Sequence, residues 1–180
     1  MIWKIDPTHS HVSFAIRVLG VSTTKGRFNA LRGYLSIDEQ NPASSWVEAE
    51  VDAASIDTHN MLRDAHLRSA AFFAVKQYPT ITFQSTSIEH AGGQDYQVTG
   101  NLSMHGVTRP ITFDVAYRGQ STQMGVSAGL TVKAQINRND FGVGRGAAVQ
   151  LAASSMVTIE IELEAVQQAV EVREAMAIAE

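Results

Sequence analysis

The sequence predicts an all-β protein: an antiparallel barrel of eight strands, with a short inserted helix and a C-terminal helical tail. Three observations support this fold class. Apolar and polar residues alternate along most of the chain, which is typical of strands that bury one face. The alternation stops between residues 59 and 73, where apolar residues follow a helical spacing. The last segment, residues 165–180, is rich in Ala, Val and Glu and contains neither Pro nor Gly.

The alternation defines eight or nine strands separated by turn residues. Clear runs cover residues 12–18, 111–118, 130–136 and 157–163, and weaker runs cover 26–37, 47–53, 80–88 and 96–105. A sandwich and a closed barrel both bury one face of such strands. The single helical insertion favours the barrel. A barrel of about eight strands has an interior that side chains fill or that holds one ligand.

The insertion reads as a helix within residues 59–73, which Asp57 or Thr58 is suited to cap. Asp64 and Arg68 stand four residues apart in the order that favours an ion pair. We therefore expect Arg68 to lie on a solvated face of this helix. A charged helix inserted into a β chain is better suited to guard an opening than to hold a sheet together.

The same helix offers candidates for contact with a ligand. His66 shares an apolar stripe with Leu62, Ala65 and Phe73, so we expect His66 and the neighbouring Arg63 to face the interior. A cationic group beside an aromatic-rich interior is suited to an anionic or quinone-like head group.

Two further segments depart from the strand pattern. Residues 137–153 form an irregular stretch, and structureless loops of this length tend to be lids or binding loops. Residues 165–180 are predicted to form a helical extension, which leaves residues 1–164 as a barrel domain that folds without it. The extension packs either on its own barrel or on a second chain, and we favour a homodimer.

Composition excludes several classes of protein. A length of 180 residues, 44% of them hydrophobic, is enough for one domain with a real core. The net charge of −4 and the absence of a basic run argue against nucleic acid as a partner. The chain has no cysteine, so disulfides and thiolate chemistry are excluded.

The N-terminal residues enter a strand pattern at once and lack the features of a secretory signal. We therefore expect a cytoplasmic protein, or a periplasmic one if a leader has been removed. No apolar run approaches the roughly 20 residues of a membrane helix, so no integral membrane segment is expected.

Motifs for metals, nucleotides and catalysis are weak. His9 and His11 stand one residue apart, but no Glu follows until Glu39, so we expect no metal site there. The glycines of residues 142–146 lack the strand, helix and Lys-Ser/Thr that phosphate-binding loops need. No Gly-x-Ser-x-Gly sequence is present. We expect no cofactor and no catalytic residue.

Sequence segments spread over most of the chain resemble the YceI family, also described as polyisoprenoid-binding or lipocalin-like. The matching segments are Ile5-Asp6-Pro7-Thr8-His9-Ser10, Gly26-Arg27-Phe28, Ser55-Ile56-Asp57-Thr58, Arg63-Asp64-x-His66-Leu67-Arg68-Ser69-x-x-Phe72-Phe73, Tyr78-Pro79-x-Ile81-x-Phe83-x-Ser85-Thr86, Gly100-x-Leu102-x-x-His105-Gly106-Val107-Thr108, Asn137-Arg138-x-Asp140-Phe141-Gly142 and residues 157–163. They occur in order and at family-like spacing.

The resemblance implies an extended, lipocalin-like barrel that binds an isoprenoid lipid, of the quinone or polyprenyl phosphate type, in an apolar tunnel without performing chemistry. Arg63, His66 and Arg138 are then the candidates for the head group. The expected tunnel residues are Phe14, Phe28, Leu67, Phe72, Phe73, Phe83, Leu102, Phe113 and Phe141.

Two alternatives remain at this point. An enzyme would use His9, His66 or His105 with Asp64 as an acid–base set at the barrel mouth. A stress-related structural subunit would use its tail helix for assembly, and its cavity would be incidental.

Overall fold

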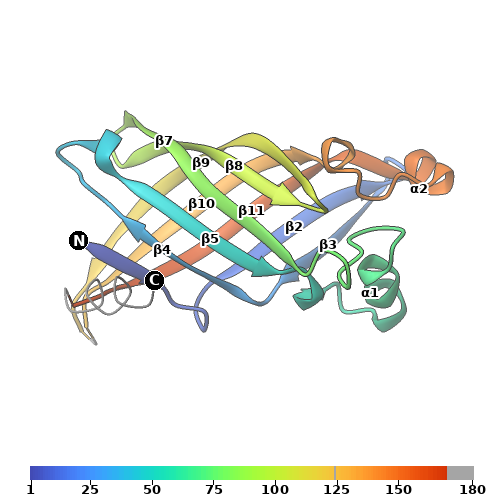
Figure 1. Ribbon diagram of the computed structural model, residues 1–180, viewed down its shortest axis with the longest axis horizontal. Coiled ribbons are helices and arrows are strands. Elements are labelled where there is room, and N and C mark those ends of the chain that lie inside the picture. The colour runs from blue at the N-terminus through green and yellow to red at the C-terminus, as the bar shows by residue number, and fades with distance from the viewer. Residues whose placement is uncertain (124, 170–180) are drawn as a thin grey trace.

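The structure is a computed structural model that describes residues 1–123 and 125–169. Its strands form one antiparallel sheet that closes on itself as a long barrel (Figure 1). The strands are β1 (Ile2–Ile5), β2 (His11–Val18), β3 (Ser22–Phe28), β4 (Leu31–Ser36), β5 (Trp46–Asp52), β6 (Ile56–Asp57), β7 (Thr80–Gly92), β8 (Asp95–Met104), β9 (Val107–Ser121), β10 (Ser127–Asn137) and β11 (Ala153–Gln167).

These strands follow eight paths around the barrel, so the predicted fold class is confirmed. The first three paths are interrupted: β1 and β2 by residues 6–10, β3 and β4 by residues 29–30, and β5 and β6 by the 3-10 helix η2 (Ala53–Ser55). The other five strands are continuous. The interruptions explain why the strand predicted over residues 26–37 is in fact two strands.

The barrel closes between its first and last strands. β1 pairs with β4 on one side and with the end of β11 on the other, in the register Trp3 to Gln167 and Ile5 to Ala165. β2 pairs with the earlier part of β11, from Ala153 to Glu162. The two short strands therefore lie one after the other along a single edge of β11.

Ser10 repairs the hydrogen bonding where β1 and β2 are interrupted. Its buried hydroxyl donates to the carbonyl of Glu164 (3.2 Å) and accepts from the amide of the same residue (3.0 Å). The amide of Asp6 also donates to the carbonyl of Glu164 (2.8 Å). We call residues 6–10 the Ser10 corner. Through it the amide and the carbonyl of Glu164 keep hydrogen-bond partners, as buried backbone groups require.

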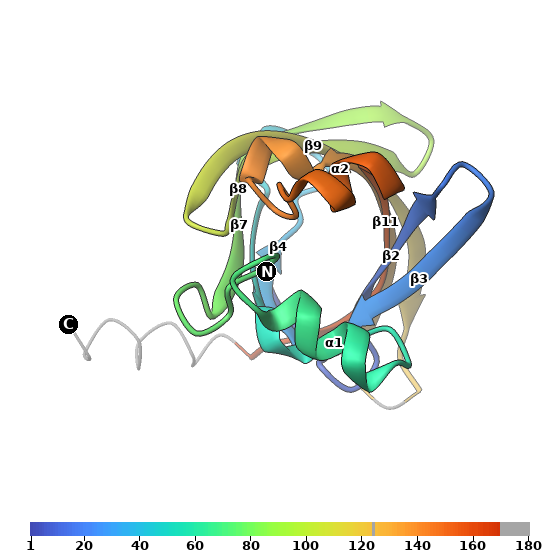
Figure 2. The same cartoon turned by 90° about the vertical axis from the view of Figure 1, so that its right-hand side faces the viewer.

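The two α-helices of the described residues lie at one end of the barrel, as Figures 1 and 2 show. We call this the helical end; it carries α1 (Met61–Arg68), α2 (Ala147–Ala152) and the β2–β3 turn at residues 19–21. The opposite end, which carries Met1 and the loop of residues 37–45, we call the N-terminal end. The loop includes the 3-10 helix η1 (Pro42–Ser44).

The inserted helix is shorter than predicted, and Asn60 rather than Asp57 or Thr58 caps it. The Asn60 side chain accepts from the amide of Arg63 (3.0 Å). The irregular stretch after residue 137 is not structureless, because it contains the 3-10 helix η3 (Arg138–Phe141) and α2. These short helices escaped prediction because neither is long enough to show a 3.6-residue period.

The expected boundary of the tail needs correction. Residues 165–167 continue β11 instead of beginning a helix, and Ala165 is fully buried opposite Ile5 and Ala128. The rest of the predicted helical extension, from residue 170 onward, lies outside the described residues. The closing strand therefore continues to Gln167, past residue 164, where the barrel domain was expected to end.

The most deeply buried side chains are concentrated near the two ends. Trp3, Ile5 and Leu35 pack with Ala165 near the N-terminal end. A second cluster at the helical end is made by Leu102, Ile136, Phe141 and Val143. Inward-facing side chains of both clusters, and others between them such as Val98 and Phe113, line a cavity inside the barrel.

Candidate functional site

A cavity of about 300 Å³ runs inside the barrel, within the range of pockets that hold small molecules. Its wall follows from the alternation of the strands, which turns every second residue inward. On β11, Val157, Ile159, Ile161 and Leu163 line it, which is the inward face expected from the sequence. The wall reaches from Glu39 and Ser45 near the N-terminal end to Val143 and Val149 at the helical end.

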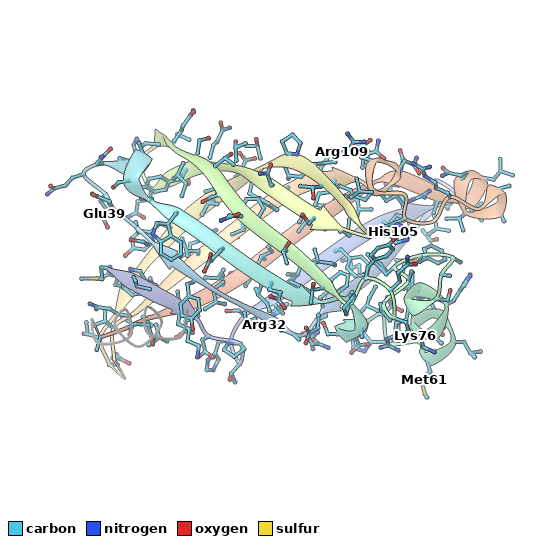
Figure 3. The ribbon with its side chains drawn as sticks, in the orientation of Figure 1. Arg32, Glu39, Met61, Lys76, His105 and Arg109 are labelled. Carbon is cyan, nitrogen blue, oxygen red and sulfur yellow. The ribbon has the colours of Figure 1, made fainter. Side chains whose placement is uncertain are left out.

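The wall is almost entirely apolar. Over the part of the chain that the structure describes, its only charged residues are Glu39 and Arg138. They lie toward opposite ends, with Glu39 in the loop far from the helices (Figure 3). A wall of this kind favours a long hydrocarbon chain over a polar ligand.

Eight of the nine expected tunnel residues line the cavity: Phe14, Phe28, Leu67, Phe72, Phe73, Phe83, Leu102 and Phe113. Several make edge-on aromatic contacts, with ring centroids 5.5 Å apart for Phe28 and Phe73 and 5.0 Å apart for Phe83 and Phe113. Such contacts fix the rings in place and so give the wall a defined shape.

Phe141 is the exception. Its side chain has no exposed surface and packs with Leu102, Ile136 and Val143 at the helical end, outside the cavity wall. It sits in η3, past the end of β10, where strand alternation no longer determines direction. In the sequence, Phe141 follows the polar residues 138–140 and precedes a glycine, which indicates a loop position. Gly142 does adopt the left-handed conformation.

Arg138 is buried, with 5% of its surface exposed, and lines the cavity. Its guanidinium donates to the backbone carbonyls of Ser154 (2.8 Å), Ala153 (2.9 Å), Gly144 (2.8 Å) and Val143 (3.1 Å). It therefore joins η3 and the following loop to the start of β11.

The charge of Arg138 is not neutralised by a side chain within the described residues, because no ion pair there joins it to a carboxylate. Burial lowers the pKa of Arg138 below its ordinary value, although arginine remains protonated in proteins. The helical end of the cavity wall therefore carries a net positive charge.

Arg63 and His66, the other two expected head-group residues, do not line the cavity. The Arg63 side chain donates to the hydroxyl and the carbonyl of Thr58 (both 2.8 Å). His66 is exposed and contacts the ring of Phe72, with centroids 4.9 Å apart. The expectation that these two face the interior is wrong.

The reason is the orientation of α1. Asp64 is buried and accepts from the Thr58 amide (2.9 Å) and hydroxyl (2.5 Å), which turns this side of the helix toward the barrel. Leu62 and Ala65 are consequently exposed. The hydrogen bonds to the buried Asp64 carboxylate, and not the apolar stripe, therefore determine which side of α1 faces the barrel.

Arg68 also differs from expectation. It does not form an ion pair with Asp64 but donates to the carbonyls of Ala54 (2.9 Å) and Ile56 (2.8 Å). It therefore fastens α1 to the end of the β5–β6 path. Arg68 is a structural residue, as its neighbour Asp64 is.

The His105-Gly106 pair forms the turn between β8 and β9. Both residues have positive φ, 54° and 73°, as two-residue hairpin turns of this type require. A Cβ at Gly106 would lie 2.7 Å from the ring of Tyr78. The Nδ1 atom of His105 donates to the carbonyl of Phe141 (2.9 Å) and so holds η3 against the turn.

The acid–base set of the enzyme alternative is not assembled in the described residues. Asp64 accepts a hydrogen bond from Thr58, and His105 donates one to the carbonyl of Phe141. His66 contacts the ring of Phe72. His9 contacts Asp6 in the corner between β1 and β2.

A different group of possible metal ligands is brought together by this corner. Donor atoms of Asp6, His9 and Glu164 all lie within 4.8 Å of one another. His11, the partner expected for His9, is not among them. His9 and Asp6 already share a hydrogen bond of 2.7 Å, and His9 is exposed. That His9 and His11 hold no metal stays a prediction, which elemental analysis of the purified protein checks.

We predict that His9 titrates above pH 6.5 and that its pKa falls in Asp6→Asn. The hydrogen bond to the Asp6 carboxylate raises the pKa of His9 above its ordinary 6.5, and the same bond lowers the pKa of Asp6 below 3.8. The contribution of His9 to stability is therefore full below pH 6.5 and is lost as the pH rises through its folded-state pKa. The contribution of Asp6 is present above pH 3.8 and is lost on acidification. NMR titration of the His9 ring measures this, and an unchanged midpoint in Asp6→Asn would contradict it.

Several residues of the cavity wall were missed from the sequence. The polar ones among them are Ser36, Glu39, Ser45, Thr82, Tyr96 and Tyr117. Tyr117 could have been found, because it shares a face with Phe113 and Val115; burial raises its pKa, so the phenol is neutral at pH 7. Glu39 lies in a loop, where no periodicity signals its direction.

A closed barrel of eight strands around an apolar cavity places the chain among lipocalin-like β-barrel proteins. A sequence model described as "YceI-like domain" matches residues 3–165. The chain belongs to the YceI family, as its motifs predicted.

Similar proteins support this assignment. A UPF0312 protein of Pseudomonas aeruginosa is 39% identical over 145 residues, which cover 78% of this chain and 75% of the relative. Protein YceI of Escherichia coli is 37% identical over 170 residues, covering 92% and 87%.

Solved structures resemble the barrel. BcnA of Burkholderia cenocepacia superposes with a TM-score of 0.80 at 27% identity, covering 89% of this chain and 98% of that one. A polyisoprenoid binding domain from Saccharophagus degradans, implicated in plant cell wall breakdown, gives a TM-score of 0.70 at 19% identity, covering 92% of this chain and 98% of that one, and shows likeness of fold alone.

None of the helices in the described residues is long and apolar enough to span a bilayer.

Proposed function

We propose that this protein binds an isoprenoid lipid, holds the hydrocarbon chain inside the barrel, and performs no chemistry on it. The observation that carries the proposal is the cavity, whose wall is apolar from the helical end to the N-terminal end apart from a few polar side chains. The lining on β11 alone runs from Ala153 to Leu163, about 33 Å along the strand. A long, narrow, apolar space fits a chain better than a compact ligand.

Burial of a chain accounts for tight binding. A chain of ~20 carbons transferred from water contributes about 16 kcal/mol at ~0.8 kcal/mol per methylene, before the costs of association. The family assignment agrees with this function, because a polyisoprenoid binding domain has the same fold. We expect lipid to copurify with the protein.

Solvent extraction and native mass spectrometry test the proposal. Protein from more than one expression host should carry lipid, and the extract should contain polyprenyl chains. Protein that shows only the mass of the bare chain from every host would contradict the proposal.

A substitution that fills the cavity should abolish binding. Ala49 lies midway along β5 and lines the cavity, whereas its neighbour Glu48 points outward. We predict that Ala49→Trp lowers the affinity for farnesol at least tenfold, because the indole occupies the path of the chain. Glu48→Trp is the matched control and should bind normally. Equal affinities of the two variants, measured by titration, would place the chain elsewhere.

We further propose that the head group lies at the helical end, beside Arg138. The support is its positive charge on the cavity wall, which has no carboxylate partner within residues 1–123 and 125–169 and is suited to a phosphate or a quinone carbonyl. Arg63 lies outside the wall but at the same end.

Photo-crosslinking distinguishes the two ends without a substitution. A prenyl phosphate with a photoreactive group next to the phosphate should label residues 138–149, at the helical end. Labelling of residues 36–45 would instead place the head group beside Glu39, and the proposed orientation would be wrong.

A further inference from the structure

The helical end displays large apolar side chains that no part of the described barrel covers. Leu19, Val21, Met61, Leu62 and Leu151 are between 71% and 90% exposed. They come from three separate segments, the β2–β3 turn, α1 and α2, which surround the same end of the barrel in Figure 2. At the opposite end, the one comparably exposed large apolar side chain within the described residues is that of Met1.

Folding does not explain these residues. Leu19 has a φ of 53°, a left-handed conformation that glycine or asparagine adopts at lower cost. Its amide donates to the carbonyl of Ala152 (2.7 Å), which fixes the turn against the end of α2 while the side chain points to solvent. On α1, Asp64 and Leu67 face the barrel, so Met61 and Leu62 lie on the outer side. The Met61 side chain extends away from the molecule in Figure 3.

Basic residues are also concentrated at the helical end. The chain as a whole has 18 acidic and 14 basic residues. The helical end reverses this balance: its segments carry Arg17, Lys25, Arg63, Arg68, Lys76 and Arg145, against Asp57, Asp64 and Asp140. Asp64 is buried and hydrogen-bonded, so it contributes little to the surface.

Exposed apolar side chains surrounded by basic residues match the surface of an anionic bilayer. The apolar groups insert among the lipid chains and the basic groups lie at the level of the charged head groups. The cavity reaches this end, since Leu67, Phe72 and Val149 belong to its wall. A lipid leaving the bilayer here would enter the barrel by its chain and keep its head group near Arg138.

We propose that the helical end is a docking surface for an anionic lipid bilayer, from which the barrel loads and to which it returns its lipid. The exchange of cargo rests on the proposed function, whereas the docking itself does not. The occupant is a membrane and not a second copy, because a symmetric dimer through this face would bring its basic residues against one another.

Flotation of the full chain with vesicles tests the docking. The protein should bind vesicles of phosphatidylethanolamine and phosphatidylglycerol, and bind vesicles of phosphatidylcholine alone much more weakly. The triple variant Leu19→Ser, Leu62→Ser, Leu151→Ser should lose at least about tenfold in affinity for the anionic vesicles, because each leucine gives up apolar contact with the lipid.

Two pairs of lysines provide a matched test of charge. Lys76 lies at the helical end (Figure 3), and Lys25 lies on β3, the strand that follows the β2–β3 turn. Lys4 lies on β1 and Lys133 in the middle of β10, and all four lysines are exposed. Lys25→Gln with Lys76→Gln should weaken vesicle binding roughly tenfold, since each removes a charge from the docking face. Lys4→Gln with Lys133→Gln changes the net charge equally and should leave binding unchanged.

Farnesol binding without vesicles separates docking from cargo. All these variants should bind farnesol as the unaltered protein does, which also shows that they are folded. If farnesol does not bind any of them but the vesicle results hold, the proposed function fails and the docking surface stands. Equal losses from both lysine pairs, no effect of the triple variant, or no vesicle binding would overturn the docking surface. A dimer in sedimentation that the triple variant abolishes would also overturn it.

Discussion

A chain that ends at Glu164 will lose its closed barrel, whereas a chain that ends at Ala169 will keep it. The shorter chain lacks residues 165–167, which pair with residues 3–5 of β1, and it loses the buried contact of Ala165 with Ile5 and Ala128. The lost backbone hydrogen bonds and buried contacts amount to roughly 4 kcal/mol or more, a large share of the stability of one domain.

Thermal unfolding and hydrogen exchange at the amides of β1 measure this effect. The chain of 169 residues is the control, since it keeps the hydrogen bond from the Gln168 amide to the Ile2 carbonyl (2.9 Å). Similar melting temperatures for the two chains would show that β1 is not needed to close the barrel. Light scattering on the longer truncation also tests the predicted homodimer: an unchanged mass would remove residues 170–180 from the assembly.

Replacement of Arg138 by methionine is expected to destabilise the protein by roughly 3–5 kcal/mol. Methionine fills much of the space but leaves the carbonyls of Val143, Gly144, Ala153 and Ser154 without this donor. Each buried acceptor left without a partner costs about 1–3 kcal/mol. Arg138→Lys keeps the charge but not the planar set of donors, so it should recover less than half of the loss.

Urea unfolding measures these differences, with Arg109→Met as the control. Arg109 is exposed on β9, and its replacement should change stability by no more than about 0.5 kcal/mol. If Arg138→Met proved as stable as this control, Arg138 would not fasten η3 to β11. Its proposed contact with the head group would then be its only role.

The sequence was sufficient to predict the barrel because the barrel depends on alternation, which is local. Ile159, Ile161 and Leu163 face the cavity, as their pattern required, and eight of the aromatic and aliphatic tunnel residues were placed correctly on the wall. Strand interruptions such as the Ser10 corner were not predicted, because they depend on partners more than 150 residues away.

The candidate head-group residues illustrate the limit of local reasoning. Arg63 and His66 were assigned to the interior from an apolar stripe, but the contact between Asp64 and Thr58 decides which side of α1 faces the barrel. The hydrogen bonds that a single residue, Thr58, donates to the buried carboxylate of Asp64 produce no periodic pattern in the sequence, so the sequence does not reveal them. Motif residues such as Arg68 and His105 likewise proved to hold backbone segments together.

The pairing of β1 with the end of β11 also governs how the barrel forms. Trp3 and Gln167 are neighbours in space but nearly the whole chain apart in sequence. During synthesis on a ribosome, β1 is made long before residues 165–167, and the two segments cannot pair until those residues have emerged. Closure is therefore a late step with a large loop-closure entropy, typical of slowly folding β topologies. Until it occurs, the apolar lining is open to solvent and to other chains, so chaperones and early exposure to lipid should raise the yield of folded protein.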